Sequence, residues 1–176
     1  MSVKGSMRQY FLLRESICDE GSDLLFRTPF DEDVESPIYF GEVDDEDYIG
    51  WKPVIKKEIH DFAMAEKKIG VKLHKSMIEY FNSYWFADMD GFIKTYYIIL
   101  QSIRQREDIE SYLDSLSQYM NNHGNTLQYI PIGIEGNGRI VVIDNQSGFI
   151  LLEDYERGSF ELLSTDLRQL IINLRL

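Results

Sequence analysis

The sequence predicts a single α+β domain over residues 1–176, in which a mainly antiparallel sheet is covered by an N-terminal helical hairpin and by further helices. Three observations support this class. Apolar residues recur at helical spacing on both sides of Gly70. The last 50 residues contain short apolar runs separated by turn sequences, which is typical of an antiparallel meander. The order of helices, strand, helix, strands and helix differs from the regular alternation of a parallel sheet.

The N-terminal part contains a weak helical signal and then an acidic segment. Apolar residues between 8 and 26 predict a short first helix that ends before Gly21. Residues 28–50 contain nine Asp and Glu residues, no Lys or Arg, and several aromatic residues. This composition is too charged for a core, so we expect a long loop over the domain with a short strand at Ile38–Phe40. Pro53 suits the entry to the next helix.

The helical hairpin extends from Ile59 to Tyr84, with Gly70 as the stop between its two helices because glycine enters the left-handed conformation at low cost. The first predicted apolar face consists of Ile55, Ile59, Phe62, Ala63 and Ile69, and the second of Leu73, Met77, Tyr80, Phe81 and Tyr84. Two such faces across a short connection must cover another layer, most simply a sheet.

The second half predicts a strand, a helix, the meander and a closing helix. Phe92–Leu100 is expected as one buried strand, and Asp108 as the cap of a helix that ends at Gly124. Asn137-Gly138 between two apolar runs predicts a β-hairpin. The remaining expected elements are strands at Phe149–Glu153 and Phe160–Leu163, and a last helix capped by Ser164 or Thr165.

The net charge of −12 and the pI near 4.6 narrow the classes of partner. Phosphate backbones and anionic lipid headgroups repel such a surface, whereas a basic protein surface complements it. The single cysteine, Cys18, excludes an internal disulfide framework. No apolar run reaches the ~18 residues that a membrane-spanning helix needs. These features predict a cytoplasmic protein that is not inserted in a membrane.

The sequence shows no motif for catalysis, a metal or a cofactor. Gly133, Gly136 and Gly138 are followed by a predicted strand, whereas a phosphate loop needs a helix there. A calcium loop starting at Asp45 fails at Ile49 and Lys56. The histidines lack metal-ligand spacing, and Cys18 has no nearby cation that would lower its pKa. We therefore expect a binding protein and not an enzyme.

The candidate partner-binding residues combine the carboxylates of the acidic segment with two tryptophans. They are Asp31, Glu32, Asp33, Glu35, Glu42, Asp44, Asp45, Glu46, Asp47, Trp51 and Trp85. Carboxylates would attract a basic surface, and aromatic side chains are favoured anchors at interfaces. The residues alone leave a solvated loop open as the alternative for the acidic segment, and the core as the alternative for Trp85.

A family resemblance begins in the helical hairpin. Glu66, Ile69-Gly70, Leu73, Met77 and Tyr80-Phe81 resemble the helix–glycine–leucine–helix signature of the SUKH superfamily. Within it the chain is most similar to the Syd family, the SecY-interacting proteins. Further matches in the same order are Glu35-Ser36-Pro37-Ile38, Tyr48–Pro53, Leu100-Gln101-Ser102, Glu107-Asp108-Ile109, Asn145–Gly148 and Leu163–Leu174. The resemblance covers residues 35–174; the first 30 residues do not match.

The resemblance implies a small cytosolic α+β protein without catalysis that binds the basic cytoplasmic loops of the SecY translocon subunit through an acidic groove. It would then be peripheral at the cytoplasmic face of the inner membrane. The wider superfamily also contains immunity proteins that neutralise bacterial toxins. A toxin domain therefore remains open as the alternative partner.

Overall fold

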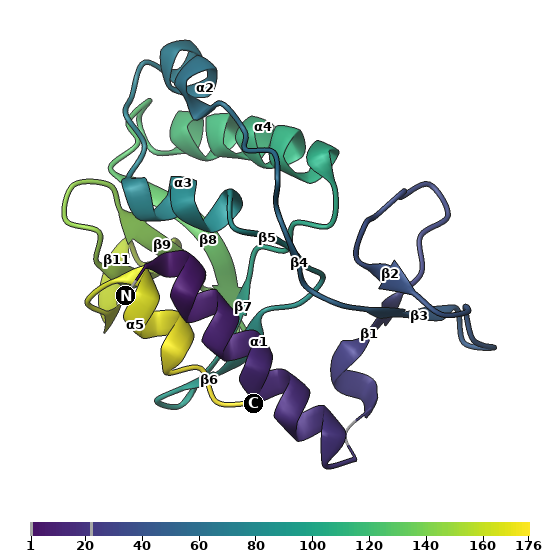
Figure 1. Cartoon of the computed structure of the whole chain (residues 1–176). Helices are drawn as coiled ribbons and strands as arrows, with labels where there is room; N and C mark the ends of the chain where they lie inside the picture. Colours follow the sequence, from purple (N-terminus) through teal and green to yellow (C-terminus); the bar gives the residue numbers. More distant parts are fainter. Residues whose placement is uncertain (1, 22) are drawn as a thin grey trace.

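The computed structural model describes residues 2–21 and 23–176 and confirms the α+β class (Figure 1). The helices are α1 (Val3–Asp19), the 3-10 helix η1 (Asp23–Phe26), α2 (Phe62–Ile69), α3 (Lys75–Phe81), α4 (Arg106–Asn122) and α5 (Leu167–Ile172). The strands are β1 (Arg27–Pro29), β2 (Tyr39–Phe40), β3 (Tyr48–Trp51), β4 (Val54–Ile55), β5 (Tyr84–Trp85), β6 (Asp90–Ile93), β7 (Tyr96–Leu100), β8 (Tyr129–Glu135), β9 (Ile140–Asp144), β10 (Ile150–Asp154) and β11 (Ser159–Ser164).

The main sheet has six antiparallel strands in the order β11-β10-β9-β8-β7-β6, which is the expected meander extended by one hairpin. The Asn-Gly turn joins β8 to β9, and β11 forms an edge, as predicted. Strands β7 and β8 approach closely at Gly133, where an added Cβ would lie 2.3 Å from the Ile99 carbonyl oxygen. Only glycine fits this crossing of the two backbones.

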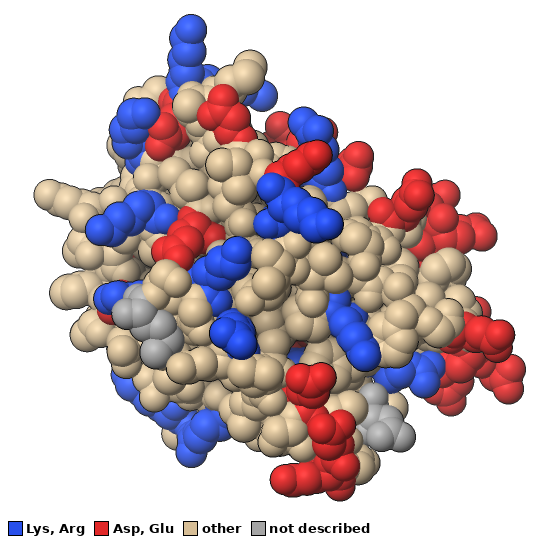
Figure 2. Space-filling model, in the orientation of Figure 1, with Lys and Arg blue, Asp and Glu red and all other residues tan. Residues whose placement is uncertain are grey.

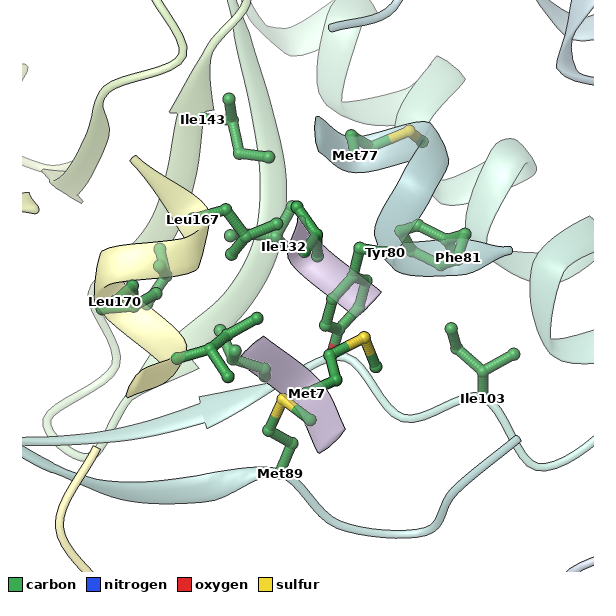
Figure 3. Packing of buried hydrophobic residues seen from close by; sticks show 14 of the residues in the cluster. Met7, Met77, Tyr80, Phe81, Met89, Ile103, Ile132, Ile143, Leu167 and Leu170 are labelled. Carbon is green, nitrogen blue, oxygen red and sulfur yellow. The ribbon is translucent and has the colours of Figure 1, made fainter. Parts of the chain in front are cut away.

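The apolar core lies between the sheet and helices α1, α3 and α5 (Figure 3). Met7 of α1, Tyr80 of α3 and Leu167 of α5 are almost completely buried against sheet residues such as Ile132 and Ile143. Helix α4 packs beside α3. The ring centroids of Tyr112 and Phe81 are 4.3 Å apart, and the Tyr112 hydroxyl donates a hydrogen bond to the Pro131 carbonyl.

The predicted helical hairpin is present as α2 and α3, with Gly70 at φ +75° as the C-cap of α2. Its first helix is shorter than expected. Asp61 caps α2 because its carboxylate accepts a hydrogen bond from the Ala63 N–H, so the helix begins at Phe62. Ile55 therefore belongs to β4, and Ile59 precedes the helix with 75% of its surface exposed. Ala63 is in α2 but exposed, and Tyr84 lies in β5 and not in α3. The predicted apolar faces are therefore wrong at these four residues.

Three other elements differ in their bounds. Residues 92–100 form parts of a hairpin, β6 and β7, because the chain turns at Lys94, whose φ is +54°. Helix α4 is capped by Gln105, and the expected cap Asp108 lies at the third helical position, where its carboxylate accepts from the Gln105 N–H. Helix α5 is capped by Asp166, which accepts from the Gln169 N–H.

The acidic segment is more ordered than a long loop. It contributes to a second antiparallel sheet in the order β1-β3-β2, on one side of the molecule next to the C-terminal part of α1 (Figure 1). Thr28 of β1 and Ile49 of β3 are cross-strand partners, and both are buried, as is Ile38 just before β2, so these side chains attach the small sheet to the rest of the domain. The expected strand at Ile38–Phe40 corresponds to β2.

Candidate partner-binding site

The two connections of the small sheet place all nine predicted carboxylates on one side of the molecule. The connection β1–β2 carries Asp31, Glu32, Asp33 and Glu35, and the connection β2–β3 carries Glu42, Asp44, Asp45, Glu46 and Asp47. We call these nine residues the acidic surface. Asp31 is half-buried and the other eight are exposed. Figure 2 shows the acidic side chains gathered over this sheet, with a second acidic group at the C-terminal end of α1.

Two of these carboxylates are engaged within the loops. Asp44 accepts hydrogen bonds from the N–H groups of Tyr48 (2.8 Å) and Glu46 (3.0 Å) and forms an ion pair with Arg27. The hydrogen bond from the Tyr48 N–H lowers the pKa of Asp44 most, and the Glu46 N–H and Arg27 lower it further. Asp31 accepts from the Asp33 N–H at 3.1 Å. Both therefore shape the loops, and the charge of Asp44 is also paired with Arg27.

The other seven carboxylates accept no hydrogen bond and form no ion pair within the described residues. They belong to Glu32, Asp33, Glu35, Glu42, Asp45, Glu46 and Asp47. They are exposed, so their charge is available to a basic molecule that approaches this side. Loops on a packed scaffold are a common location for binding residues.

The two tryptophans do not have the same environment. Trp51 is completely buried, with its ring centroid 5.1 Å from that of Phe26, because β3 is the central strand of the small sheet and faces the core. Its prediction as a partner contact is wrong. Trp85 is half-buried, and the Lys56 amine lies 3.6 Å from its ring centroid. A contact of Trp85 with a partner stays a prediction.

A cavity of about 670 Å³ lies between α1 and the small sheet, and we call it the α1 groove. Its lining residues are Arg8, Phe11, Leu12, Glu15, Cys18, Asp19, Phe26, Arg27, Phe40, Gly41, Glu42, Gly50, Lys52, Pro53 and Tyr84. Phe11 and Tyr84 are buried, with their ring centroids 5.4 Å apart, whereas Leu12 and Phe40 are 52% and 46% exposed. The groove therefore has an aromatic floor and accessible apolar walls.

Buried Arg14 anchors α1, the helix that forms one wall of the α1 groove. Its Nε donates to the Leu25 carbonyl at 2.7 Å, and its Nη1 donates at 2.7 Å both to the Asp90 carboxylate and to the Tyr10 hydroxyl. Its guanidinium also lies 5.8 Å from the centroid of the Phe26 ring. Burial raises the pKa of Tyr10 to about 12, which keeps the hydroxyl protonated as a donor. These contacts fix α1 relative to η1 and β6.

The sequence comparisons identify the family. A sequence model described as Syd protein (SUKH-2) matches residues 9–175. The chain belongs to the Syd family. Similar proteins include the Protein Syd of Idiomarina loihiensis, 29% identical over 80% of this chain and 78% of the relative, and that of Photobacterium profundum, 26% identical over 80% and 77%. The Protein Syd of Pseudoalteromonas atlantica is 24% identical over 78% and 77%.

Membership of the Syd family confirms the resemblance and extends it toward the N-terminus. The matched region begins at residue 9, within α1, so it includes the helix that forms one wall of the groove. Sequence reasoning missed the groove because its walls come from segments about 30 residues apart in the chain. The exposed Leu12 beside acidic residues on α1 was the signal available.

Among the residues that the structure describes, no group of three His, Cys, Asp or Glu side chains could hold a metal ion. No helix in the described part of the chain is both long enough and apolar enough to cross a bilayer.

Proposed function

We propose that this Syd-family protein binds basic cytoplasmic loops of the SecY translocon subunit through its acidic surface, without catalysing a reaction. The observation that carries the proposal is the group of seven unpaired, exposed carboxylates on one small sheet. Family membership supports a protein partner of this kind. The protein would act in the cytoplasm, at the inner face of the membrane, through its partner and without inserting itself.

Electrostatics accounts for how the acidic surface would select such a loop. Charges of one sign on a surface raise the local concentration of an oppositely charged partner and speed encounter. Surface charges are screened beyond about 8 Å at physiological ionic strength, so the partner must present its Lys or Arg residues close to these loops. The small sheet provides a fixed base for the loops, which limits the ordering cost on binding.

The toxin domain is the other partner that the sequence left open. The family model and the relatives above are named Syd, which favours SecY. Binding to a toxin is therefore an outcome of the test and not a second proposal.

The test is the double charge reversal Asp45→Lys/Glu46→Lys, measured with SecY in nanodiscs at low and high salt. Their carboxylates are exposed and have no partner within the described residues, so the free energy of unfolding should change by less than about 0.5 kcal/mol. We expect the Kd for SecY to rise about tenfold at low salt, and the difference to shrink at high salt.

The matched control is Asp114→Lys/Glu156→Lys, which makes the same charge change at exposed positions of α4 and the β10–β11 turn. The control should bind SecY nearly as tightly as the wild type. Equal losses in both variants would show that only net charge matters. Unchanged affinity in the first variant would remove the acidic surface from binding, and a measured Kd for a toxin domain but none for SecY would contradict the proposed partner.

A further inference from the structure

We propose that the α1 groove receives an apolar side chain of the same basic segment that the acidic surface attracts. The bound segment would then carry a leucine or aromatic residue next to its lysines or arginines. This inference rests on the proposed function, and it adds a subsite whose contribution is hydrophobic and not electrostatic.

The size and lining of the groove suit one large apolar side chain and the backbone that carries it. A volume of about 670 Å³ is within the range of ligand pockets, roughly 300–1,000 Å³. Leu12 on one wall and Phe40 on the other face the same cavity and remain half-exposed above the buried Phe11 ring. A bound apolar side chain would remove these surfaces from water, which is the main source of affinity in such anchors.

The charges around the groove indicate a cationic segment and its direction. Glu15 and Asp19 of α1 line the groove, and neither carboxylate has a partner within the described residues. Glu42 lines the opposite wall and also belongs to the acidic surface, so the two sites are continuous.

Three bases also line the groove, namely Arg8, Lys52 and Arg27, and the last of these is paired with Asp44. Arg8 is two helical turns before Glu15. Burial raises the pKa of the Tyr84 hydroxyl, and the nearby charge of Arg8 opposes this shift. Lys52 also lines the groove, and its amine is 4.9 Å from the centroid of the Phe40 ring. These bases repel lysine or arginine side chains. The basic part of the segment should therefore point toward Glu15, Asp19 and Glu42.

The walls are held in place before any partner binds. The Phe40 ring packs closely against Gly50, where an added Cβ would be 2.9 Å from the ring atom Cζ. Arg14 fixes α1 to η1 through the Leu25 carbonyl, and Phe26 of η1 lines the groove. A preformed groove avoids the ordering cost that weakens most interfaces.

The experiment uses the full chain and two lysine-rich peptides that differ only in a central leucine or alanine. Titration calorimetry should show that the wild type binds the leucine peptide about 10-fold more tightly. The variant Leu12→Ser should lose this preference. Its neighbour Leu13→Ser is the matched control, because Leu13 is 42% exposed on the same helix but does not line the groove. It should keep the preference.

Cys18 supplies a readout on the unmutated chain, since it is the only cysteine and it lines the groove. The leucine peptide should slow its alkylation by a maleimide more than the alanine peptide does at equal occupancy.

The outcomes separate this inference from the proposed function. Equal affinity of both peptides for the wild type, with binding that salt weakens, would overturn the groove subsite and leave the acidic surface in place. Binding that depends on Leu12 but is unchanged by Asp45→Lys/Glu46→Lys would contradict the acidic surface and leave the groove. No binding of either peptide would overturn the inference.

Discussion

At the scale of single residues, Arg14 is a buried charge whose guanidinium donates hydrogen bonds to three different residues. Its side chain is 5% exposed, and it bonds Asp90, Tyr10 and the Leu25 carbonyl. Removing one partner of such a network leaves the others buried without compensation. We expect Arg14→Met to lower the free energy of unfolding by about 3–5 kcal/mol, measured by urea denaturation.

The matched control for Arg14 is Arg106→Met. Arg106 pairs with Glu110 on the surface of α4, where both side chains are mostly exposed. A surface pair of this type contributes about 0–1 kcal/mol, so the control should unfold close to the wild type. If Arg14→Met were as stable as Arg106→Met, the Arg14 network would not be what holds α1 in place.

Lys56 is a second buried charge, and it predicts a pH dependence. Its amine donates to the Phe81 carbonyl at 2.6 Å beside the Trp85 ring, and burial lowers its pKa to about 7, against a smaller opposite effect of Asp108. Between pH 7 and 10.5 the unfolded chain holds this proton more tightly than the folded one. The free energy of unfolding should therefore rise with pH in this window, by at most about 1.4 kcal/mol per unit.

The measurement is urea denaturation at several pH values for the wild type, Lys56→Met and the exposed neighbour variant Lys57→Met. Relative to Lys56→Met, the wild type should gain stability as pH rises from 7 to 10, because below pH 7 it carries the full cost of the buried charge. Lys57→Met should follow the wild type. Parallel pH profiles for the wild type and Lys56→Met would contradict the lowered pKa.

At the scale of elements, the α2–α3 hairpin explains the structural roles of Glu66, Gly70 and Leu73 in the family signature. The Glu66 carboxylate accepts from the Leu73 N–H at 2.9 Å and from the Lys72 amine at 2.6 Å, so it closes the connection after Gly70. The hydrogen bond from Lys72 lowers the pKa of Glu66 most, and the bond from the Leu73 N–H lowers it further. Leu73 is then directed into the core. The signature therefore describes a hydrogen-bonded connection between two helices.

Elements with a strong local pattern could be predicted from the sequence. The α2–α3 hairpin, α4, the β8–β9 hairpin and the edge strand β11 follow from apolar periodicity, Gly70 and Asn137-Gly138. The first residues of the helices were harder to predict, because several polar residues near each helix start could serve as the N-cap. Asp61 and Asp166 took the cap positions because their carboxylates reach free N–H groups, a choice that several neighbouring polar residues offered equally in the sequence.

The small sheet and the groove could be predicted only in part. The carboxylates were recognised as one acidic segment, but β1 and β3 are short and gain their stability from packing against α1 and the core. The sequence predicts Trp51 as an aromatic anchor for a partner, whereas its burial depends on contacts with Phe11 and Phe26, which lie at least 25 residues earlier. Contacts of this range leave no periodic signal.

At the scale of the whole molecule, the net charge of −12 is unevenly distributed, with seven unpaired carboxylates on one small sheet. Like charges at this density repel one another and reduce the stability of the folded state at low ionic strength. The same charges are those that we propose attract the partner. Salt should thus act in opposite directions on folding and on binding.

We expect the melting temperature of the wild type to rise by a few degrees when NaCl is increased from about 0.01 M to 0.15 M, since the Debye length falls from about 30 Å to 8 Å. Affinity for a basic partner should fall over the same range. Differential scanning calorimetry of the wild type and of Asp45→Lys/Glu46→Lys tests the cause, because that variant relieves repulsion and its melting temperature should depend less on salt. An equal salt dependence in both proteins would show that repulsion within the acidic surface does not limit stability, and that these carboxylates are spaced widely enough to be tolerated without a partner.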